Sequence, residues 1–152
     1  MDALAALGRF EANEHHYVLR VYFEDTDLTG VVYHANYLRF MERARSDMLL
    51  AAGIDQRVAF ERGDGAYAVR SLAIQYRAPA RLGDELVVVS RLRRLRPASV
   101  DIHQRVMRRD SIVAEAEVEA AFVSLSGRPR RQPAEWMAVF APLVGQGENS
   151  PR

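Results

Sequence analysis

The segment VYHANYLRFMERARSDMLLAAG, residues 32–53, decides the fold because it keeps helical spacing over a long stretch. Its apolar side chains recur at steps of three and four residues, so they gather on one face of a helix. Gly53 is typical of the residue that follows a helix. The segment therefore predicts an amphipathic helix of about five turns. The predicted apolar face consists of Tyr33, Tyr37, Phe40, Met41, Ala44, Met48 and Ala51, and the polar face of Arg39, Glu42, Arg43 and Asp47.

Segments on both sides of this helix alternate with the two-residue period of β-strands. Residues 17–23 precede it with Tyr, Leu, Val and Phe at alternate positions. Four more strands are predicted after it, at 68–76, 86–95, 99–109 and 112–125, with a hairpin turn at 109–111. One strand, one long helix and four strands indicate an α+β domain in which an antiparallel sheet of about five strands wraps the helix.

The length of 152 residues is typical of one domain. We expect this domain at residues 17–131, preceded at 1–16 by a frayed arm or short helix and followed at 132–152 by a short helix and a disordered tail. The N-terminus lacks the basic start and the long apolar run of a secretory signal. No apolar run approaches the roughly 18 residues of a transmembrane helix. We therefore expect a cytoplasmic protein without a transmembrane segment.

The composition excludes several kinds of site. The chain has no cysteine, which excludes a disulfide framework, a cysteine nucleophile and a thiolate metal site. All 21 of its lysine-or-arginine residues are arginine, so a Schiff-base lysine and a phosphate-loop lysine are excluded as well. The net charge of +1, without a nucleic-acid-binding motif, argues against a nucleic-acid partner.

The loop EDTDLTG, residues 24–30, places Asp25 and Asp27 just ahead of the predicted helix. A helix start presents unpaired N–H groups and partial positive charge, which can polarise a substrate carbonyl as an oxyanion site. Amides near Tyr33 and His34 would then bind the carbonyl oxygen while Asp27 approaches the carbonyl carbon. Capping of the helix by Asp25 or Asp27 is the structural alternative.

Two other motifs share part of this loop. Asp25, Asp27 and Thr29 have the spacing that opens a calcium-binding EF-hand, but Asn36 stands where that loop requires a bidentate glutamate. Asp-x-Asp-x-Thr after a hydrophobic strand is also the signature of haloacid-dehalogenase phosphatases, with Asp25 as nucleophile and Asp27 as acid/base. Such phosphatases normally use a lysine and alternating βα units, and the sequence indicates neither.

The string EDTDLTGVVYHANY, residues 24–37, resembles the hotdog-fold acyl-CoA thioesterases of the 4-hydroxybenzoyl-CoA thioesterase type, in particular the Tol–Pal-associated acyl-CoA thioesterase branch. The strings FMERAR at residues 40–45 and QYRAPARLGD at residues 75–84 continue the similarity. The resemblance spans residues 18–131. It implies the hotdog fold, in agreement with the order of strands and helix predicted above.

The resemblance also implies roles for individual residues. Asp27 is the catalytic carboxylate, either as a nucleophile through a mixed anhydride or as a general base on water. The oxyanion donor is the backbone N–H of His34, whose side chain is expected to orient the substrate or the water. Tyr33 and Asn36 are expected to shape the pocket. Since a coenzyme A thiolate leaves with a pKa of about 8.5 by analogy with cysteine, we expect no strong general acid. The expected hydrolase uses no cofactor and no metal.

Arginines are concentrated in two parts of the chain. Residues 77–109 contain nine arginines against three acids, and a second cluster lies within residues 128–131. Arginine binds phosphate oxygens in pairs. In the resembling family, basic residues near the strand ends and the C-terminal segment hold the nucleotide of coenzyme A. The candidates for this role are Arg93, Arg94, Arg128 and Arg130.

The resemblance implies a homo-oligomer, namely a tetramer built from dimers, in which the sheets of two protomers join and the active site lies at the subunit interface. A long edge strand would otherwise stay open to pairing. The expected activity is hydrolysis of an acyl-CoA thioester to the free acid and coenzyme A, with acyl carrier protein as the alternative acyl carrier. The remaining alternative is a non-catalytic scaffold that binds acyl-CoA or acyl carrier protein for the cell-envelope Tol–Pal system.

Overall fold

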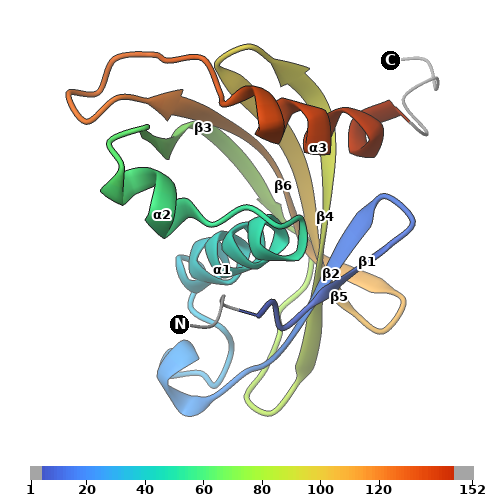
Figure 1. The fold of residues 1–152 in the computed structure, drawn as a ribbon. Helices are drawn as coiled ribbons and strands as arrows, with labels where there is room; N and C mark the ends of the chain where they lie inside the picture. The colour runs from blue at the N-terminus through green and yellow to red at the C-terminus, as the bar shows by residue number, and fades with distance from the viewer. Residues whose placement is uncertain (1–4, 146–152) are drawn as a thin grey trace.

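An antiparallel sheet of six strands curves around helix α1 in the computed structural model, which describes residues 5–145 (Figure 1). The strand order across the sheet is β1-β2-β4-β5-β6-β3, so β1 and β3 are its edges. The predicted α+β hotdog architecture is confirmed. The strands are β1 Arg9–Glu11, β2 Glu14–Arg20, β3 Ala66–Tyr76, β4 Glu85–Arg96, β5 Ser99–Arg108 and β6 Ser111–Val123, and the helices are α1 Asn36–Ala51, α2 Gln56–Glu61 and α3 Ala134–Gly145.

Helix α1 buries most of the apolar face that the sequence predicts, although Tyr33 was wrongly placed on it, because Tyr33 precedes the helix and is 49% exposed. Phe40 and Ala44 are almost inaccessible to solvent and pack against the inner side chains of the sheet. The helix begins at Asn36 rather than near Val32, as the spacing had predicted. The reason is that the Val32 N–H donates to the backbone oxygen of Ala80 (2.8 Å), which fastens the residues ahead of the helix to the segment after β3.

The long strands present one apolar and one charged face. On β6, Ala116 and Val118 point toward the core, whereas Glu117 between them is exposed, so the Ala/Glu run is a strand as predicted. Charged side chains on the outer face pair across strands, as Arg105 does with Glu14 (3.1 Å). The inner face thus supplies the hydrophobic core around α1, and the outer face is polar.

The prediction of a frayed arm or short helix over residues 1–16 is wrong for the part that the structure describes up to β2, because β1 and β2 form a hairpin. A buried carboxylate holds this hairpin against α1. Asp47 accepts hydrogen bonds from the N–H groups of Leu7 and Gly8 (both 2.7 Å) and lies 2.9 Å from Nε2 of His15. Asp47 was predicted on the polar face of the helix, yet it is buried because these donors satisfy its oxygens.

Other differences are small. Strand β2 ends at Arg20, and a 3-10 turn at Phe23–Asp25 replaces the predicted end of that strand. Helix α2 has no counterpart in the sequence prediction, whereas α3 matches the predicted C-terminal helix. The expected tail at 146–152 lies outside the described residues, as do residues 1–4.

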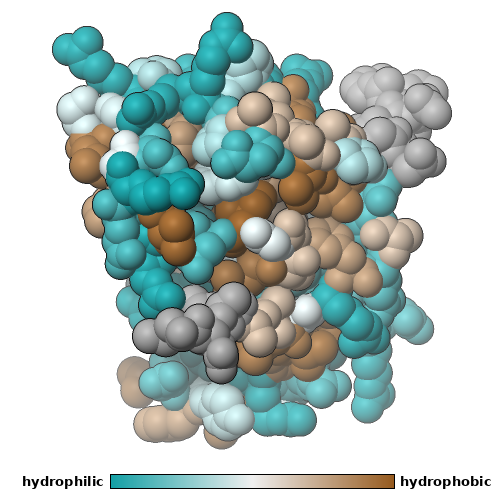
Figure 2. All heavy atoms as spheres, viewed as in Figure 1, coloured by the Kyte–Doolittle hydropathy of each residue, from teal (hydrophilic) through white to brown (hydrophobic). Residues whose placement is uncertain are grey.

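No helix within residues 5–145 is long and apolar enough to cross a membrane. Figure 2 shows that apolar side chains gather on the face that α1 and α3 occupy in Figure 1, between hydrophilic regions. Since the sheet wraps only one side of α1, this face is where the core comes nearest to solvent.

Candidate active site

The acidic loop, residues 24–30, is held tightly between β2 and α1. The Asp27 N–H donates to Val31 O (2.9 Å), and Gly30, at a positive φ of 80°, closes the turn by donating to Asp27 O (3.1 Å). Glycine adopts that backbone conformation without strain. Val31 also forms a bridge with Arg81 in the segment after β3. The loop therefore presents Asp27 from a fixed backbone.

Asp25 is a structural carboxylate of this loop. It is 5% exposed, and its two oxygens accept hydrogen bonds from the Tyr22 N–H (2.9 Å) and from Nδ2 of Asn36 (2.6 Å). Its backbone oxygen accepts from the Tyr33 N–H (2.9 Å). Asp25 thus ties the loop to the start of α1, and its carboxylate is turned away from any substrate that approaches from solvent.

Asp27 is the exposed acid of the pair. Its Oδ1 accepts two hydrogen bonds from Thr29, one from the hydroxyl (2.7 Å) and one from the backbone N–H (2.8 Å). These bonds to Thr29, the hydroxyl bond first, hold the pKa of Asp27 below its usual value. The backbone N–H groups of Val31 and of Asp27 itself lower this pKa further. Both bonds from Thr29 go to Oδ1. Asp27 therefore offers an ionised, oriented carboxylate for a reaction.

His34 lies between this loop and α1. Its backbone oxygen accepts a hydrogen bond from the Tyr76 hydroxyl (3.0 Å), and its ring contacts the rings of Tyr33 and Tyr76 at centroid distances of 4.7 and 6.1 Å. Tyr33 N–H donates to Asp25 O (2.9 Å) and Asn36 N–H donates to Tyr33 O (2.8 Å), whereas the Ala35 N–H has no hydrogen-bond partner within residues 5–145. In the described part of the chain, the His34 N–H has no hydrogen-bond partner. It is thus free to donate to a ligand at the start of the helix.

An open hollow of about 310 Å³ lies beside His34, lined by Val32, Tyr37, Tyr76 and residues 77–79 as well. The carboxylate of Asp27 and the amide of His34 belong to the same short loop-to-helix segment. An anionic oxygen and a free N–H donor are the two groups needed to attack a carbonyl carbon and to stabilise the oxyanion that forms. The structure joins three of the predicted site residues, because the His34 ring contacts Tyr33 and the Asn36 N–H donates to Tyr33 O. Asp27 lies on the same segment but does not line the hollow.

The predicted phosphate-binding arginines lie elsewhere. Arg93 and Arg94 are on β4, where Nη1 of Arg93 lies 3.6 Å from Glu117 on the outer face of the sheet. Arg128 and Arg130 are in the loop between β6 and α3, and Nη1 of Arg130 donates to the backbone of the segment that leads into β3 (3.0 Å).

Strand β3 separates this last pair from Asp27. Arg130 lies near its first residue, Ala66, whereas Tyr76 at its last residue contacts His34. A strand of 11 residues spans about 33 Å. Figure 1 shows the acidic loop and the β6–α3 loop at opposite ends of the molecule. One chain alone therefore does not bring Arg128 or Arg130 to Asp27.

Two residues of the site were missed by the sequence analysis. Thr29 orients Asp27, and the Asp-x-Thr spacing could have predicted this contact because such side chains bond to amides two residues away. Tyr76 was noted only as part of a resembling string. Its contact with His34 joins residues 42 positions apart, so only the tertiary fold could place it.

Comparison with known proteins agrees with this fold. The family model of the Thioesterase-like superfamily matches residues 21–142. The acyl-CoA thioesterase YbgC of Haemophilus influenzae is 39% identical over 129 residues, covering 84% of this chain and 95% of that protein. The crystal structure of a probable thioesterase from Bartonella henselae superposes with a TM-score of 0.76 and 36% identity, covering 79% of this chain and 99% of that one.

A crystal structure of 4-hydroxybenzoyl CoA thioesterase superposes with a TM-score of 0.77, covering 86% of this chain and all of that one, and its 21% identity makes it a likeness of fold alone. The resemblance predicted from the loop and helix strings is thereby confirmed. Because the family model covers most of the chain and the relative from Haemophilus influenzae aligns over nearly its whole length, the chain belongs to the Thioesterase-like superfamily.

Proposed function

We propose that this protein hydrolyses acyl-CoA thioesters to the free acid and coenzyme A. The observation that carries the proposal is the exposed carboxylate of Asp27, oriented by Thr29 and located on the segment that leads to the unpartnered His34 amide. The relative from Haemophilus influenzae is itself named an acyl-CoA thioesterase.

In the proposed reaction the His34 N–H donates to the thioester oxygen and so polarises the carbonyl. Asp27 either attacks the carbonyl carbon, forming a mixed anhydride that water then hydrolyses, or removes a proton from the attacking water. In both routes a C–O bond forms and the C–S bond breaks. The thiolate can leave without a general acid, because a thiol pKa of about 8.5 makes it a good leaving group.

The other site residues have supporting roles in this proposal. Asn36 donates to Asp25 and so fixes the loop, while the rings of Tyr33 and His34 border the reaction site. We propose that the exposed imidazole of His34 orients the substrate or the water.

We further propose that two copies join through β3. This edge strand is long, and Val69 on it is an exposed apolar residue. Antiparallel pairing about the middle of β3 would put the Ala66 end of one copy beside the Tyr76 end of the other. Arg128 and Arg130 of the second copy would then approach the acidic loop of the first, where the phosphates of coenzyme A would need cations.

We also propose a higher oligomer, further phosphate ligands and a cellular location for this protein. The apolar surface around α1 and α3 in Figure 2 supports burial of a further face, which a tetramer of dimers would provide. On the outer face of the sheet, Arg93 and Arg94 remain candidate phosphate ligands. A link to the Tol–Pal system and acyl carrier protein as the alternative acyl carrier rest on the resemblance of the loop strings. We also propose a cytoplasmic location, which rests on the sequence pattern described above.

The proposal is tested by incubating the purified protein with a panel of aliphatic and aromatic acyl-CoA thioesters and measuring thiol release. Turnover of at least one thioester, with equal amounts of free acid and coenzyme A, is the expected result. Binding of the same thioesters by calorimetry without any thiol release would instead support the non-catalytic scaffold.

A further inference from the structure

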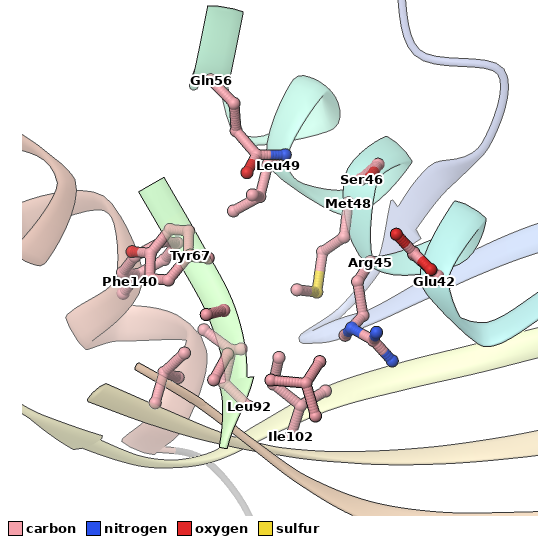
Figure 3. A pocket seen from close by; sticks show the side chains of 14 residues that line it. Glu42, Arg45, Ser46, Met48, Leu49, Gln56, Tyr67, Leu92, Ile102 and Phe140 are labelled. Carbon is pink, nitrogen blue, oxygen red and sulfur yellow. The ribbon is translucent and has the colours of Figure 1, made fainter. Parts of the chain in front are cut away.

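A second hollow lies on the opposite half of α1 from the acidic loop. It is a cavity of about 190 Å³ between the C-terminal half of α1, the first residues of β3 and the inner face of the sheet (Figure 3). Apolar side chains form most of its wall. They are Met48, Leu49, Ala68, Val69, Leu92, Val100, Ile102, Ala120 and Phe140.

Arg45 is the one cation among the residues that line this cavity in the described part of the chain. Figure 3 shows its side chain extending from α1 toward the strands of the sheet. Nη1 of Arg45 donates to Oε1 of Gln104 (2.9 Å), and Gln104 in turn donates to Met41 O (3.0 Å) and Ser90 Oγ (2.9 Å). This network fixes the guanidinium on the inner side of the sheet.

The charge of Arg45 is not neutralised by a direct partner. Within residues 5–145, no carboxylate lies within ion-pairing distance of its guanidinium, and the exposed Glu42 at the mouth of the cavity acts on it only from a distance. Burial lowers the pKa of Arg45 from its usual value, as expected for a cation in an apolar setting. Its remaining N–H groups are therefore available for an anionic group that enters the cavity.

Size and chemistry together define the ligand. The cavity is small beside the roughly 300–1,000 Å³ of sites that enclose a drug-sized ligand, so it suits the end of an acyl group rather than a nucleotide. A planar guanidinium binds a carboxylate through two parallel hydrogen bonds. We propose that the cavity receives the far end of the acyl group and that Arg45 selects acyl groups that end in a carboxylate. This inference rests on the proposed thioesterase function.

The position of the cavity sets the length of acyl group it can take. Asn36 at the start of α1 and Arg45 are separated by about 14 Å along the helix axis, so a long acyl chain would be needed to join them within one copy. If two β3 strands pair as proposed, the cavity beside Tyr67 and Val69 of one copy adjoins the acidic loop of the other, and a shorter chain would suffice.

The test compares matched thioesters that differ only in the terminal group. Adipyl-, suberyl-, sebacyl- and dodecanedioyl-CoA would be assayed against hexanoyl-, octanoyl-, decanoyl- and dodecanoyl-CoA with the wild type and with Arg45→Met. We expect the ratio of kcat/KM for the dicarboxylic over the monocarboxylic member to fall at least about tenfold in Arg45→Met for one or more lengths. Arg45→Lys, which keeps the charge but not the planar fork, should retain part of the preference.

The control is Arg43→Met, which removes an exposed arginine of the same helix that does not line the cavity. A second measurement avoids turnover by using an Asp27→Asn background. Calorimetry then compares the binding of adipyl- to dodecanedioyl-CoA with and without Arg45→Met. An unchanged ratio in a folded Arg45→Met, or a wild type that prefers the monocarboxylic member at every length, overturns the inference while leaving thioesterase activity intact. Absence of hydrolysis with every thioester would count against the proposed function instead.

Discussion

Thr29 donates two hydrogen bonds to one carboxylate oxygen of Asp27, one from its hydroxyl (2.7 Å) and one from its backbone N–H (2.8 Å). The two residues are only two positions apart, so the loop itself orients the exposed acid. This arrangement has consequences that can be measured.

Replacing Thr29 should change the pH dependence of catalysis. In Thr29→Val the hydroxyl bond is lost, so the pKa of Asp27 should rise toward its ordinary value. Since the ionised carboxylate is the active form, the acidic limb of the profile of kcat/KM should move to higher pH. Thr29→Ser keeps the hydroxyl and should keep the profile. Superimposable profiles for the wild type and Thr29→Val would show that the hydroxyl does not act on the catalytic acid.

Asp25→Asn should lower stability and activity together. The substitution places an amide against the Tyr22 N–H and Nδ2 of Asn36, so at least one donor loses its acceptor. A loss of about 1–3 kcal/mol in the free energy of unfolding is expected from chemical denaturation. A phosphatase would instead require Asp25 as a nucleophile. Magnesium-dependent phosphate release that Asp25→Asn abolishes without loss of stability would contradict the structural role.

The buried carboxylate of Asp47 should contribute strongly to stability. Asp47→Asn leaves fewer acceptor sites for the N–H groups of Leu7 and Gly8 and for His15. We expect the free energy of unfolding to fall by about 2 kcal/mol, with faster hydrogen exchange in β1 and β2. Arg39→Gln, on an exposed position of the same helix, is the matched control. Equal stability of the two variants would show that the hairpin is held by other contacts.

His15 should make the protein less stable in mild acid. Burial lowers its pKa below the ordinary value, more than the neighbouring Asp47 raises it. The unfolded chain therefore binds the proton more readily, so this contribution to stability is present above pH of about 6.5 and is lost as the pH falls toward the folded pKa. Urea unfolding at several pH values should show less of this acid sensitivity in His15→Gln. A wild type and His15→Gln with parallel pH curves would rule this residue out as the cause.

Substitution on the edge strand should weaken the proposed pairing. Val69→Arg would place charge on an exposed apolar position of β3, whereas Val18→Arg would do so on β2, which β4, β5 and β6 separate from that edge. Analytical ultracentrifugation should show a smaller species for Val69→Arg only. If both variants kept the mass of the wild type, pairing through β3 would have to be abandoned.

The sequence predicted those parts of the fold whose pattern is local. The three-and-four spacing in α1 and the Ala/Glu alternation of β6 each depend on burial of one face, so periodicity located them. The hairpin of β1 and β2 was missed because a carboxylate of α1, 32 positions from His15 in sequence, holds it. The helix start was placed too early because Val32 is paired with Ala80, a contact that no local pattern indicates.

The candidate site likewise contains residues that the local sequence pattern predicted and residues that only the tertiary fold could place. The loop string predicted that Asp27, Tyr33, His34 and Asn36 would lie together, since they are close in sequence. The arginine candidates were chosen from their clustering in the sequence and from the resembling family, and neither says on which face or at which end of this sheet a residue lies. Arg45 stood in a resembling string without a role, and only the packing of α1 against the strands placed it in a cavity.

The central claim is that Asp27 is the catalytic carboxylate of a thioesterase. The most direct measurement is kcat for the best acyl-CoA substrate, followed by thiol release, in the wild type, Asp27→Asn and Glu24→Gln. Glu24 is an exposed acid of the same loop and serves as the control for charge. A loss of about a hundredfold or more in Asp27→Asn, with Glu24→Gln close to the wild type, is the predicted result. Full activity in a folded Asp27→Asn would contradict the claim.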